Sequence, residues 1–405
     1  RRLIDAAPLV HLITHTTAEN DMSDTTDHLD QLVAWRRHLH QNPELSGSEY
    51  NTAAHIARFL QQYAPDELHT GVGGTGIAAV FKGTAAQGPT ILFRAELDAL
   101  PIAETNDTTY RSVAAGIGHK CGHDGHMAIL AGLASLLHRT RPASGRVVLL
   151  FQPAEETGAG AWAMLQDKRL LRLQPDYVFA LHNLPGLPQH QVVVRNGVFA
   201  AASTGMVVEL HGKSSHAAEP ENGVNPGAAM AELVLAFNQI AQQKERFEDL
   251  SLLTVIHARL GEVAFGTNPG YATVMATLRA YLPEDFALLK HLAQEAATHV
   301  AAKYDLRVNL HFAEEFPATL NHPEAVALVR QAAQKLQLPT QEAVHPFRWS
   351  EDFGHFTARY KGALFGIGAG LEQPQLHHAD YDFPDAIIPT GAALFYGIAQ
   401  EIMNP

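Results

Sequence analysis

The sequence predicts an α/β protein whose larger unit is interrupted by a smaller, ferredoxin-like α+β unit. From about residue 27 the apolar residues alternate between helical and strand spacing, which is typical of helices packed on a sheet. Between residues 204 and 316 the expected elements follow the order β-α-β-β-α-β, which is the ferredoxin-like order. After Pro317 the alternation of helices and strands resumes, so we expect the smaller unit to be an insertion.

The first part of the larger unit, residues 31–203, alternates helices with short apolar strands. A stretch rich in glycine and histidine precedes a helix that is apolar on most faces, which predicts that this helix is buried. The expected elements are helices over 27–40 and 51–63, strands over 77–81 and 90–93, a helix over 127–137, a strand over 147–151, a helix over 159–171 and a strand over 177–181.

The smaller unit and the end of the chain give equally regular patterns. For the smaller unit, residues 204–316, we expect a strand over 206–210, a helix over 226–243, strands over 251–260 and 272–281, a helix over 284–303 and a strand over 307–312. For the second part of the larger unit, residues 317–405, we expect a helix over 324–336, a strand over 363–367 and a helix over 390–403.

Residues 1–30 are expected to be an N-terminal extension. The chain does not begin with Met, and Met22 is followed by a polar, helix-capping stretch, so we expect residues 1–21 to be upstream or introduced sequence without a function. Two arginines begin the extension, but Asp5, Pro8 and His11 interrupt its apolar stretch and no small-residue cleavage site follows, which argues against a secretory signal.

Composition excludes several classes of protein. With 46% hydrophobic and 18% charged residues, the chain is typical of globular proteins and unlike disordered or fibrous ones. The formal charge of −13 has the wrong sign for a protein that binds nucleic acid or an anionic membrane. The single cysteine, Cys121, excludes an internal disulfide and fits a reducing compartment, so we expect a cytoplasmic location.

Four segments carry side chains that bind metals, at or near the ends of expected strands. In open α/β sheets ligands bind outside the carboxyl ends of the strands, so these distant segments can converge on one crevice. They are Cys121-Gly-His123-Asp124-Gly-His126, Gln152-Pro-Ala-Glu155-Glu156, Leu181-His182-Asn183 and Leu376-His377-His378.

The residue types indicate the chemistry. A divalent cation of borderline softness accepts thiolate, imidazole and carboxylate ligands together. Because Glu155 and Glu156 are adjacent, we expect at most one of them to share a given orientation, so one can bind metal while the other accepts a proton from an attacking water. Taken singly, Cys121 could be a small buried hydrophobe, the glutamates a solvated face and His182 a core histidine. Together, the four segments favour a metal site.

One glycine-rich motif resembles a dinucleotide-binding loop but is followed by the wrong kind of element. Gly71-Val-Gly73-Gly-Thr-Gly76 matches the spacing of a dinucleotide-binding loop, but the apolar run that follows it reads as a strand, where such a site needs a helix. We therefore expect a turn. The sequence contains no P-loop, H-E-x-x-H or G-x-S-x-G motif.

Motifs over about residues 30–403 resemble the M20 metallopeptidase superfamily, and within it the amidohydrolase branch, subfamily D, which includes hippurate hydrolase, N-acyl amino acid amidohydrolases and indoleacetyl-amino acid hydrolases. The matching motifs are Arg36-Arg-His-Leu-His40 with Pro43-Glu44-Leu45, Arg94-Ala-Glu-Leu-Asp98-Ala-Leu-Pro101, Cys121-Gly-His-Asp-Gly-His126, Gln152-Pro-Ala-Glu-Glu156, Ser215-His216-Ala-Ala, Ser350-Glu-Asp-Phe353 and Leu376-His377 with Tyr381-Asp382-Phe383. The resemblance implies a phosphorylase/hydrolase-like catalytic domain with a ferredoxin-like lid that often dimerises.

The resemblance also implies roles for single residues. It implies two divalent cations, usually manganese or zinc, held by Cys121, His123, Glu156, His182 and His377. By the same resemblance Glu155 matches the general base, and Asp98 matches an acidic residue near the site that orients a ligand or the base. His216 matches a lid histidine that reaches the substrate in some relatives, and His377 is preferred to His378 because the ligand follows the leucine directly.

Two departures from the family pattern bear on the substrate. Glu96 stands where aspartate is common, and Gly266-Thr-Asn-Pro269 replaces a more usual Asn-Val-Ile-Pro run. Arg279, later on the same expected strand, is a candidate for bidentate binding of a substrate carboxylate, with a surface ion pair as the alternative.

We therefore expect a metal-dependent amidohydrolase of the aminoacylase type, which cleaves N-acyl amino acids and forms a homodimer or higher oligomer through the lid. A dipeptidase or carboxypeptidase with the same site is the nearest alternative. A non-catalytic metal- or ligand-binding protein is a second alternative, but it would not need Glu155. A pure dimerisation module would leave the ligand set without a role.

Overall fold

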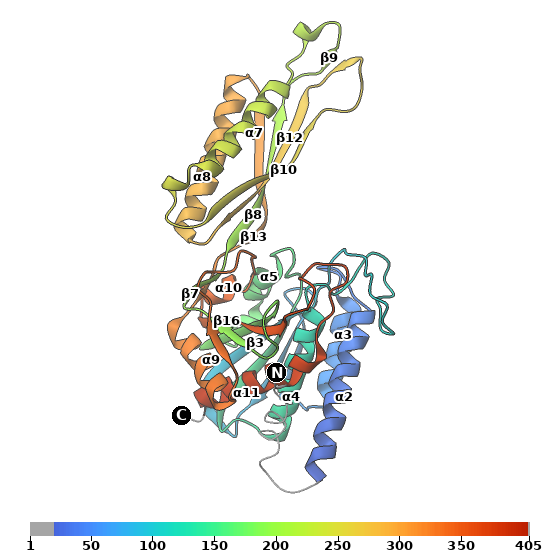
Figure 1. Cartoon of the computed structure of the whole chain (residues 1–405), viewed down its shortest axis with the longest axis vertical. Helices are drawn as coiled ribbons and strands as arrows, with labels where there is room; N and C mark the ends of the chain where they lie inside the picture. Colours follow the sequence, from blue (N-terminus) through green and yellow to red (C-terminus); the bar gives the residue numbers. More distant parts are fainter. Residues whose placement is uncertain (1–19, 404–405) are drawn as a thin grey trace. The chain divides into compact units, whose positions relative to one another are not determined.

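The computed structural model describes residues 20–403 and divides the chain into two units (Figure 1). The larger unit comprises residues up to Phe199, Leu320–His345 and the chain from His355, and the smaller unit comprises Ala200–Thr319 with Pro346–Gly354. The return of Pro346–Gly354 to the smaller unit was not anticipated from the sequence. The expected range of the smaller unit, residues 204–316, begins four residues after Ala200 and ends three residues before Thr319. The catalytic role of the larger unit and the lid role of the smaller unit remain predictions.

The larger unit is built on an eight-stranded sheet with the order β1-β2-β4-β3-β5-β16-β6-β15. Its neighbouring strands β4, β3, β5 and β16 run parallel, whereas β1 and β2 pair antiparallel with their neighbours. β6 pairs antiparallel with β16 and parallel with β15. The strands of the sheet are β1 (Glu67–Val72), β2 (Gly76–Lys82), β3 (Ala85–Glu96), β4 (Ser144–Gln152), β5 (Tyr177–Pro185), β6 (Val192–Val194), β15 (Thr340–Glu342) and β16 (Lys361–Gly370).

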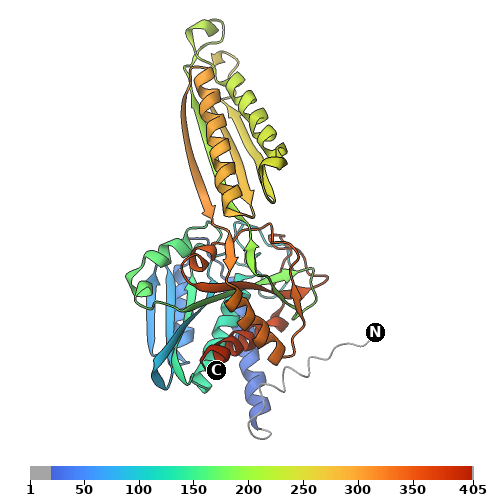
Figure 2. The same ribbon diagram turned by 90° about the vertical axis from the view of Figure 1, so that its left-hand side faces the viewer.

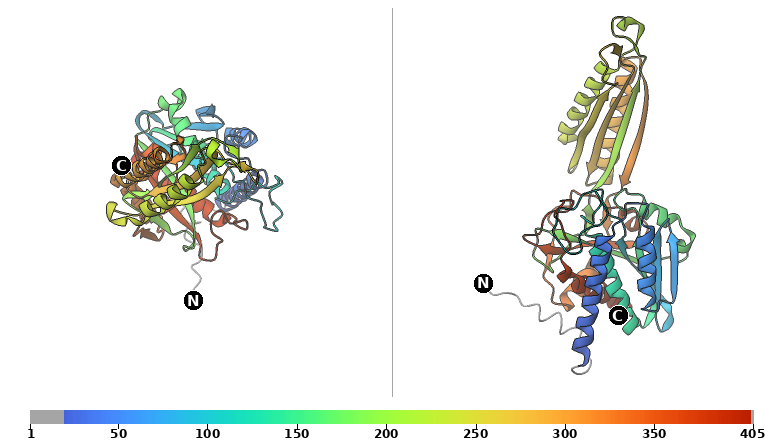
Figure 3. Two further views of the ribbon diagram at one scale, coloured as in Figure 1. Left: turned by 90° about the horizontal axis from the view of Figure 1, so that it is seen from above. Right: turned by 90° about the vertical axis from the view of Figure 1, so that its right-hand side faces the viewer.

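Helices surround this sheet, and α4 (His123–Arg139) is the most deeply buried of them (Figure 3). All of its residues from His123 to Ser135 are buried, which confirms the expectation drawn from its apolar faces. It packs against β3 and between α2 and α11. The other helices of this unit are α2 (Asn20–Gln41), α3 (Tyr50–Gln61), α5 (Gly160–Gln166), α6 (Lys168–Leu171), α9 (Pro323–Lys335), α10 (Gly354–Thr357), which begins at the unit boundary, and α11 (Ile388–Met403).

The smaller unit has the ferredoxin-like fold that the sequence predicts. Its antiparallel sheet has the order β10-β12-β8-β13, and α7 and α8 lie side by side on one face (Figure 2). Its main elements are β8 (Ala202–His211), α7 (Gly227–Gln242), β10 (Ser251–Leu260), β12 (Tyr271–Ala280), α8 (Pro283–Lys303) and β13 (Arg307–Phe316), with the short strands β9 (Ser215–His216) and β11 (Thr267–Asn268) paired beside them. A further pair, β7 (Gly197–Ala200) and β14 (Thr319–Asn321), lies where the chain passes between the units.

Three smaller findings complete the fold. Residues 1–19 of the predicted extension 1–30 lie outside the described residues, and residues 20–30 form the beginning of α2.

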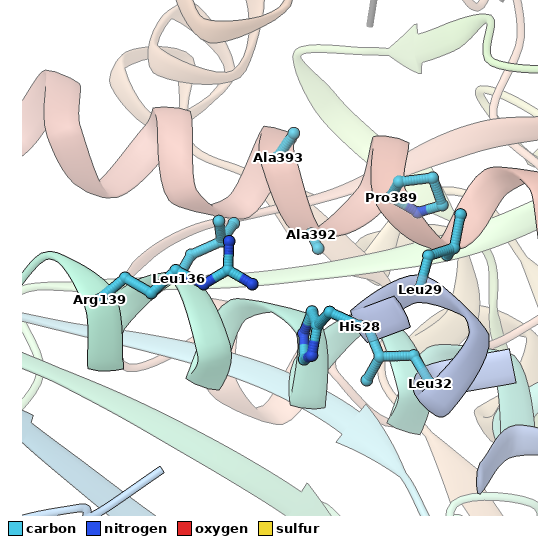
Figure 4. A pocket seen from close by; sticks show the side chains of 9 residues that line it. His28, Leu29, Leu32, Leu136, Arg139, Pro389, Ala392 and Ala393 are labelled. Atoms are coloured by element: carbon cyan, nitrogen blue, oxygen red, sulfur yellow. The ribbon is translucent and has the colours of Figure 1, made fainter. Parts of the chain in front are cut away.

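The segment Asp385–Met403 is long and apolar enough to cross a membrane by composition, but 56% of its apolar window is buried, and Leu394, Phe395 and Ile398 belong to the core. A small cavity of about 60 Å³ lies among α2, α4 and α11, and no predicted site residue lines it (Figure 4).

Candidate metal centre

The parallel strands bring two of the four predicted segments, together with Asp98, to one edge of the sheet. Asp98 follows β3, the turn with Glu155 and Glu156 follows β4, and His182 lies in the second half of β5. Because β3, β4 and β5 run parallel, their carboxyl ends point the same way. The sheet therefore gathers carboxylates and an imidazole that are far apart in the sequence.

The start of α4 supplies the next two side chains. Gly122 is the N-cap residue of this helix and has a φ of 95°, in the left-handed region that favours glycine. Cys121 lies just before this cap and His123 is the first helical residue, so both reach the same edge of the sheet. The sequence pattern placed the helix start at residue 127, because the polar residues from His123 to His126 hide the helical periodicity.

The predicted ligand atoms form overlapping groups. Within each group the ligand atoms lie within 4.8 Å of one another, and Cys121 belongs to two groups, one with His123 and His182 and one with Glu156 and His377. The Cys121 Sγ atom lies 3.5 Å from His182 Nε2, and His377 Nε2 lies 3.8 Å from a Glu156 carboxylate oxygen. The overlapping groups thus bring all five predicted ligands together in the larger unit.

The imidazole rings are held in the tautomer that a metal ligand needs. Nδ1 of His123 lies 2.9 Å from the Asp98 carbonyl oxygen, and Nδ1 of His182 lies 2.9 Å from the Asn183 carbonyl oxygen. Since a carbonyl oxygen can only accept, each Nδ1 carries the proton in the neutral ring and each Nε2 presents a lone pair. His123 Nε2 is buried and forms no hydrogen bond to any described residue, so its lone pair is available to a cation.

Acidic residues give this centre a strongly negative electrostatic potential. Burial by itself lowers the pKa of His123, but Asp98, Glu96 and Glu156 outweigh it and raise the pKa to about 10. Burial, Glu156 and Glu155 all raise the pKa of the Cys121 thiol well above its usual value. Burial lowers the pKa of His182 to about 3. A divalent cation would neutralise the excess negative charge and stabilise the thiolate, so the donor set fits such a cation.

Both adjacent glutamates face the same imidazole, which corrects one expectation from the sequence. Carboxylate oxygens of Glu155 and Glu156 each lie 3.8 Å from His123 Nε2. We expected at most one of them to share an orientation. They follow β4 in a turn in which Ala154 has a φ of 50°, so the alternation of side chains that a strand imposes does not apply.

Asp98 is buried and contacts His123, Ser46 and the backbone of Glu156 in this site. Its Oδ2 accepts hydrogen bonds from the Glu156 backbone N–H at 2.9 Å and from the Ser46 hydroxyl at 2.7 Å. Its Oδ1 lies 3.4 Å from His123 Nδ1. Burial by itself raises the pKa of Asp98, but the contact with His123 outweighs it and the pKa is lowered. The geometry therefore supports an orienting role.

His377 enters the site from a strained loop. It has a φ of 65°, and its backbone N–H donates to the Lys120 carbonyl oxygen at 2.7 Å. The buried Lys120 ammonium donates to the Tyr381 carbonyl oxygen and to Glu104, each at 2.8 Å. Lys120 therefore connects the Cys121 loop to the loop that carries His377. Lys120 was not among the residues predicted from the sequence, although its position beside Cys121 was a usable signal.

Glu96 and His126 also lie in this region, although neither is among the site residues predicted from the sequence. Glu96 forms an ion pair with Arg94 and lies 2.7 Å from His126 Nδ1. His126 Nε2 lies 2.6 Å from the Asn183 side-chain oxygen. Glu96 is thus engaged by Arg94 and His126, and both ring nitrogens of His126 have protein partners.

Two predicted substrate residues belong to the smaller unit. His216 lies on β9, is exposed, and accepts a hydrogen bond from the Ala218 backbone N–H. Arg279 lies on β12, where its guanidinium donates to the Arg348 carbonyl oxygen and the Ser350 hydroxyl. No carboxylate of the described residues forms an ion pair with Arg279, so the alternative of a surface ion pair lacks support. Burial lowers the pKa of this guanidinium.

Comparisons with known proteins agree with the geometry. The profile of peptidase family M20/M25/M40 matches residues 92–401. N-acetyl-L-cysteine deacetylase of Bacillus subtilis strain 168 is 32% identical over 375 residues, which cover 92% of this chain and 88% of the relative. An uncharacterized hydrolase of Staphylococcus haemolyticus is 33% identical over 375 residues, which cover 89% of this chain and 95% of the relative.

Two solved structures show the same architecture. The YXEP protein of Bacillus subtilis, a dinuclear metal-binding peptidase of the M20 family, has a TM-score of 0.79 at 25% identity and covers 94% of this chain and 99% of its own. The aminobenzoyl-glutamate utilization protein of Klebsiella pneumoniae has a TM-score of 0.72 at 21% identity, with 93% and 97% covered, and shares the fold.

Proposed function

Because the chain belongs to peptidase family M20/M25/M40 and is a metal-dependent amide hydrolase, we propose that it cleaves N-acyl amino acids into a carboxylic acid and a free amino acid. The observation that carries this proposal is the placement of Glu155 beside the predicted ligand cluster, 3.8 Å from His123 Nε2. A site that only binds metal needs no such additional carboxylate. The similarity to a deacetylase of N-acetyl-L-cysteine supports an N-acyl amino acid as substrate.

We assign the metal-binding role to Cys121, His123, Glu156, His182 and His377, which would hold two divalent cations, manganese or zinc. When bound, these cations supply Lewis acidity, which lowers the pKa of water and polarises the amide carbonyl. The shared position of Cys121 in two ligand groups supports two neighbouring cations. The description of the YXEP protein as dinuclear supports the same number.

Glu155 is the proposed general base. Its carboxylate takes the proton from the attacking water and later returns it to the leaving nitrogen of the amide. Asp98 orients His123 and the Glu156 backbone through the contacts described above. Arg279 is proposed to bind the substrate carboxylate, because its guanidinium is half-buried and has no acidic partner among the described residues. His216 is proposed to contact the substrate carbonyl oxygen.

A dipeptidase or carboxypeptidase activity is the second candidate, since the YXEP protein is described as a peptidase. It would use the same residues on a different acyl group. We also propose a cytoplasmic location and a homodimer formed through the smaller unit, as the family resemblance implies.

The test combines a substrate screen with the Glu155→Gln variant. We expect the metal-loaded enzyme to release amino acid from N-acetyl and N-benzoyl amino acids faster than from dipeptides. E155Q should keep its metal content, measured by elemental analysis, and lose about 10²-fold or more in kcat. Persistent hydrolysis by E155Q would refute the base assignment, and faster release from dipeptides would favour the peptidase.

A further inference from the structure

Glu49 is a fully buried carboxylate without a cationic partner. It lies at the N-cap of α3 and accepts hydrogen bonds from the backbone N–H groups of Gly47 and Ala154, each at 2.8 Å, and from the Thr75 hydroxyl at 2.7 Å. No Lys, Arg or His nitrogen of the described chain forms an ion pair with it. Burying a polar side chain is costly unless its atoms are hydrogen-bonded, so the three hydrogen bonds of Glu49 offset the cost of its position.

We propose that Glu49 is a positioning residue that fixes the turn carrying Glu155 and thereby aims the general base. The inference rests on the proposed function, because it takes Glu155 as the base. The link is direct: Glu49 Oε1 binds the N–H of Ala154, the residue that immediately precedes Glu155. Ala154 has a φ of 50°, in a region where a residue with a Cβ is strained and must be held by its surroundings.

A second carboxylate holds the other side of Glu155. Asp98 binds the N–H of Glu156 at 2.9 Å, and the Ser46 hydroxyl donates to the same Asp98 oxygen at 2.7 Å. Ser46 and Glu49 both belong to the loop between α2 and α3. This loop therefore fixes the peptide groups on both sides of Glu155, directly through Glu49 and indirectly through Asp98.

The glycine-rich motif that resembles a dinucleotide-binding loop also takes part. It forms the turn between β1 and β2, as the sequence predicts, with positive φ values at Gly71, Gly73 and Gly74. Thr75 in this turn donates to Glu49 Oε2. The turn thus supplies one of the donors that keep the buried carboxylate in place.

The experiment compares Glu49→Ala with Glu49→Gln. In E49Q the amide oxygen can still accept from Ala154 and Gly47, and its NH₂ group can donate to the Thr75 oxygen, so we expect kcat close to wild type. In E49A the turn loses its anchor, and we expect kcat to fall about 10²-fold, the typical cost of displacing a catalytic group by about 1 Å. KM and the metal content per protein, measured by elemental analysis, should stay unchanged in both.

Glu44→Ala is the matched control. Glu44 belongs to the same loop, but its carboxylate accepts from the Asn51 backbone and side chain and from the Thr52 backbone at the start of α3. E44A should lower the melting temperature and leave kcat unchanged. A kcat loss confined to E49A, with rescue in E49Q, is a result that general destabilisation would not produce.

Several outcomes would overturn the inference. Wild-type kcat in metal-loaded E49A would do so, and so would an equal kcat loss in E49A and E44A. If E49A does not fold, Glu49→Asp replaces it, because the shorter side chain keeps the charge but withdraws from the Ala154 N–H. Wild-type kcat in E49D would then overturn the proposal. E155Q is assayed in parallel: hydrolysis in E155Q refutes the assignment of Glu155 as the general base, on which this inference rests, whereas inactive E155Q with fully active E49A refutes only the positioning role.

Discussion

At the scale of single residues, the candidate centre depends on side chains that the backbone forces together. Gly122 separates Cys121 from His123 and caps α4 with a φ of 95°. A Cβ at this position would lie 2.6 Å from the Asn183 side-chain oxygen, closer than real contacts allow. The glycine therefore allows the loop to adopt a left-handed backbone conformation and also to pack closely against Asn183 on β5.

Replacing Gly122 with alanine should weaken metal binding. The substitution combines left-handed strain with a clash against Asn183, so the two flanking ligands must move apart. We expect the affinity for metal to fall about tenfold or more, as it does when the support of a ligand is lost. Competition with a chromogenic chelator measures this change.

Gly197→Ala is the control for strain alone. Gly197 has a φ of 71°, but nothing lies within 4 Å of an added Cβ. Its substitution should cost about 1 kcal/mol of stability without altering metal affinity. Equal metal affinity in G122A and wild type would contradict the role assigned to Gly122.

The sequence could predict the candidate ligands but not all of their surroundings. Thiol, imidazole and carboxylate groups near strand ends are visible in the sequence, and the structure brings all five predicted ligands together. The orientation of Glu155 and Glu156 was not predictable, because it depends on the left-handed turn at Ala154. The partners of His126 were equally hidden, since His126 lies on α4 whereas Glu96 and Asn183 lie on β3 and β5.

At the scale of elements, the start of α5 supports the turn that bears the two glutamates. Gly160 is the first residue of α5, and its N–H donates to the Ala154 carbonyl oxygen at 3.0 Å. A Cβ on Gly160 would lie 1.6 Å from the Pro153 carbonyl oxygen. The helix and the turn can pack this closely only because residue 160 has no side chain.

Gly160→Ala should therefore displace the turn. We expect a loss of about 1–3 kcal/mol in stability from overpacking, together with a lower kcat because Glu155 moves with Pro153. Thermal unfolding and steady-state kinetics of the metal-loaded enzyme measure the two effects. Gly205→Ala, whose added Cβ would meet only the Ala313 carbonyl oxygen at 3.4 Å, an ordinary contact, is the control that should change neither. Unchanged kcat in G160A would show that the turn does not depend on α5.

The elements themselves were predicted where periodicity is strong. The long helices and the ferredoxin-like order were confirmed, because a buried face gives a clear spacing of apolar residues. The strands β6 and β15 have only three residues each, too few for any period to show. Helix α4 begins at His123. We expected it to begin at residue 127, because its first turn carries polar residues instead of an apolar stripe.

At the scale of the whole molecule, buried charges connect distant parts of the larger unit. Arg36 and His40 on α2 both contact Asp124 on α4, and His40 also contacts Glu104. Glu104 accepts from Lys120, which holds the His377 loop. The motif Arg36-Arg-His-Leu-His40 thus acquires a structural role that the resemblance alone did not assign.

This network predicts a stability that depends on pH. Burial by itself lowers the pKa of His40, but hydrogen bonds to Asp124 and Glu104 outweigh it and raise the pKa from 6.5 to about 9. Protonated His40 therefore stabilises the fold fully below about pH 6.5, and this contribution is lost as the pH rises through about 9. The shift corresponds to roughly 3 kcal/mol.

His40→Gln should remove this dependence. Urea unfolding at about pH 6 and about pH 10 should show a large stability difference between wild type and H40Q at the lower pH and a smaller one at the higher pH. His38→Gln is the control, since His38 is exposed on the same helix and forms no ion pair with the described residues. A difference between wild type and H40Q that is the same at both pH values would contradict the assigned charge state.

The grouping of Cys121 with His377 has a consequence for how the protein matures. The ligand atoms of these two residues come together only after the chain has completed the entire inserted unit and returned to the sheet. Closing so long a loop is slow compared with local helix formation. Cys121, His123 and His182 precede the inserted unit in the chain, whereas His377 follows it. A nascent chain that stops before residue 377 therefore lacks one member of the proposed ligand set.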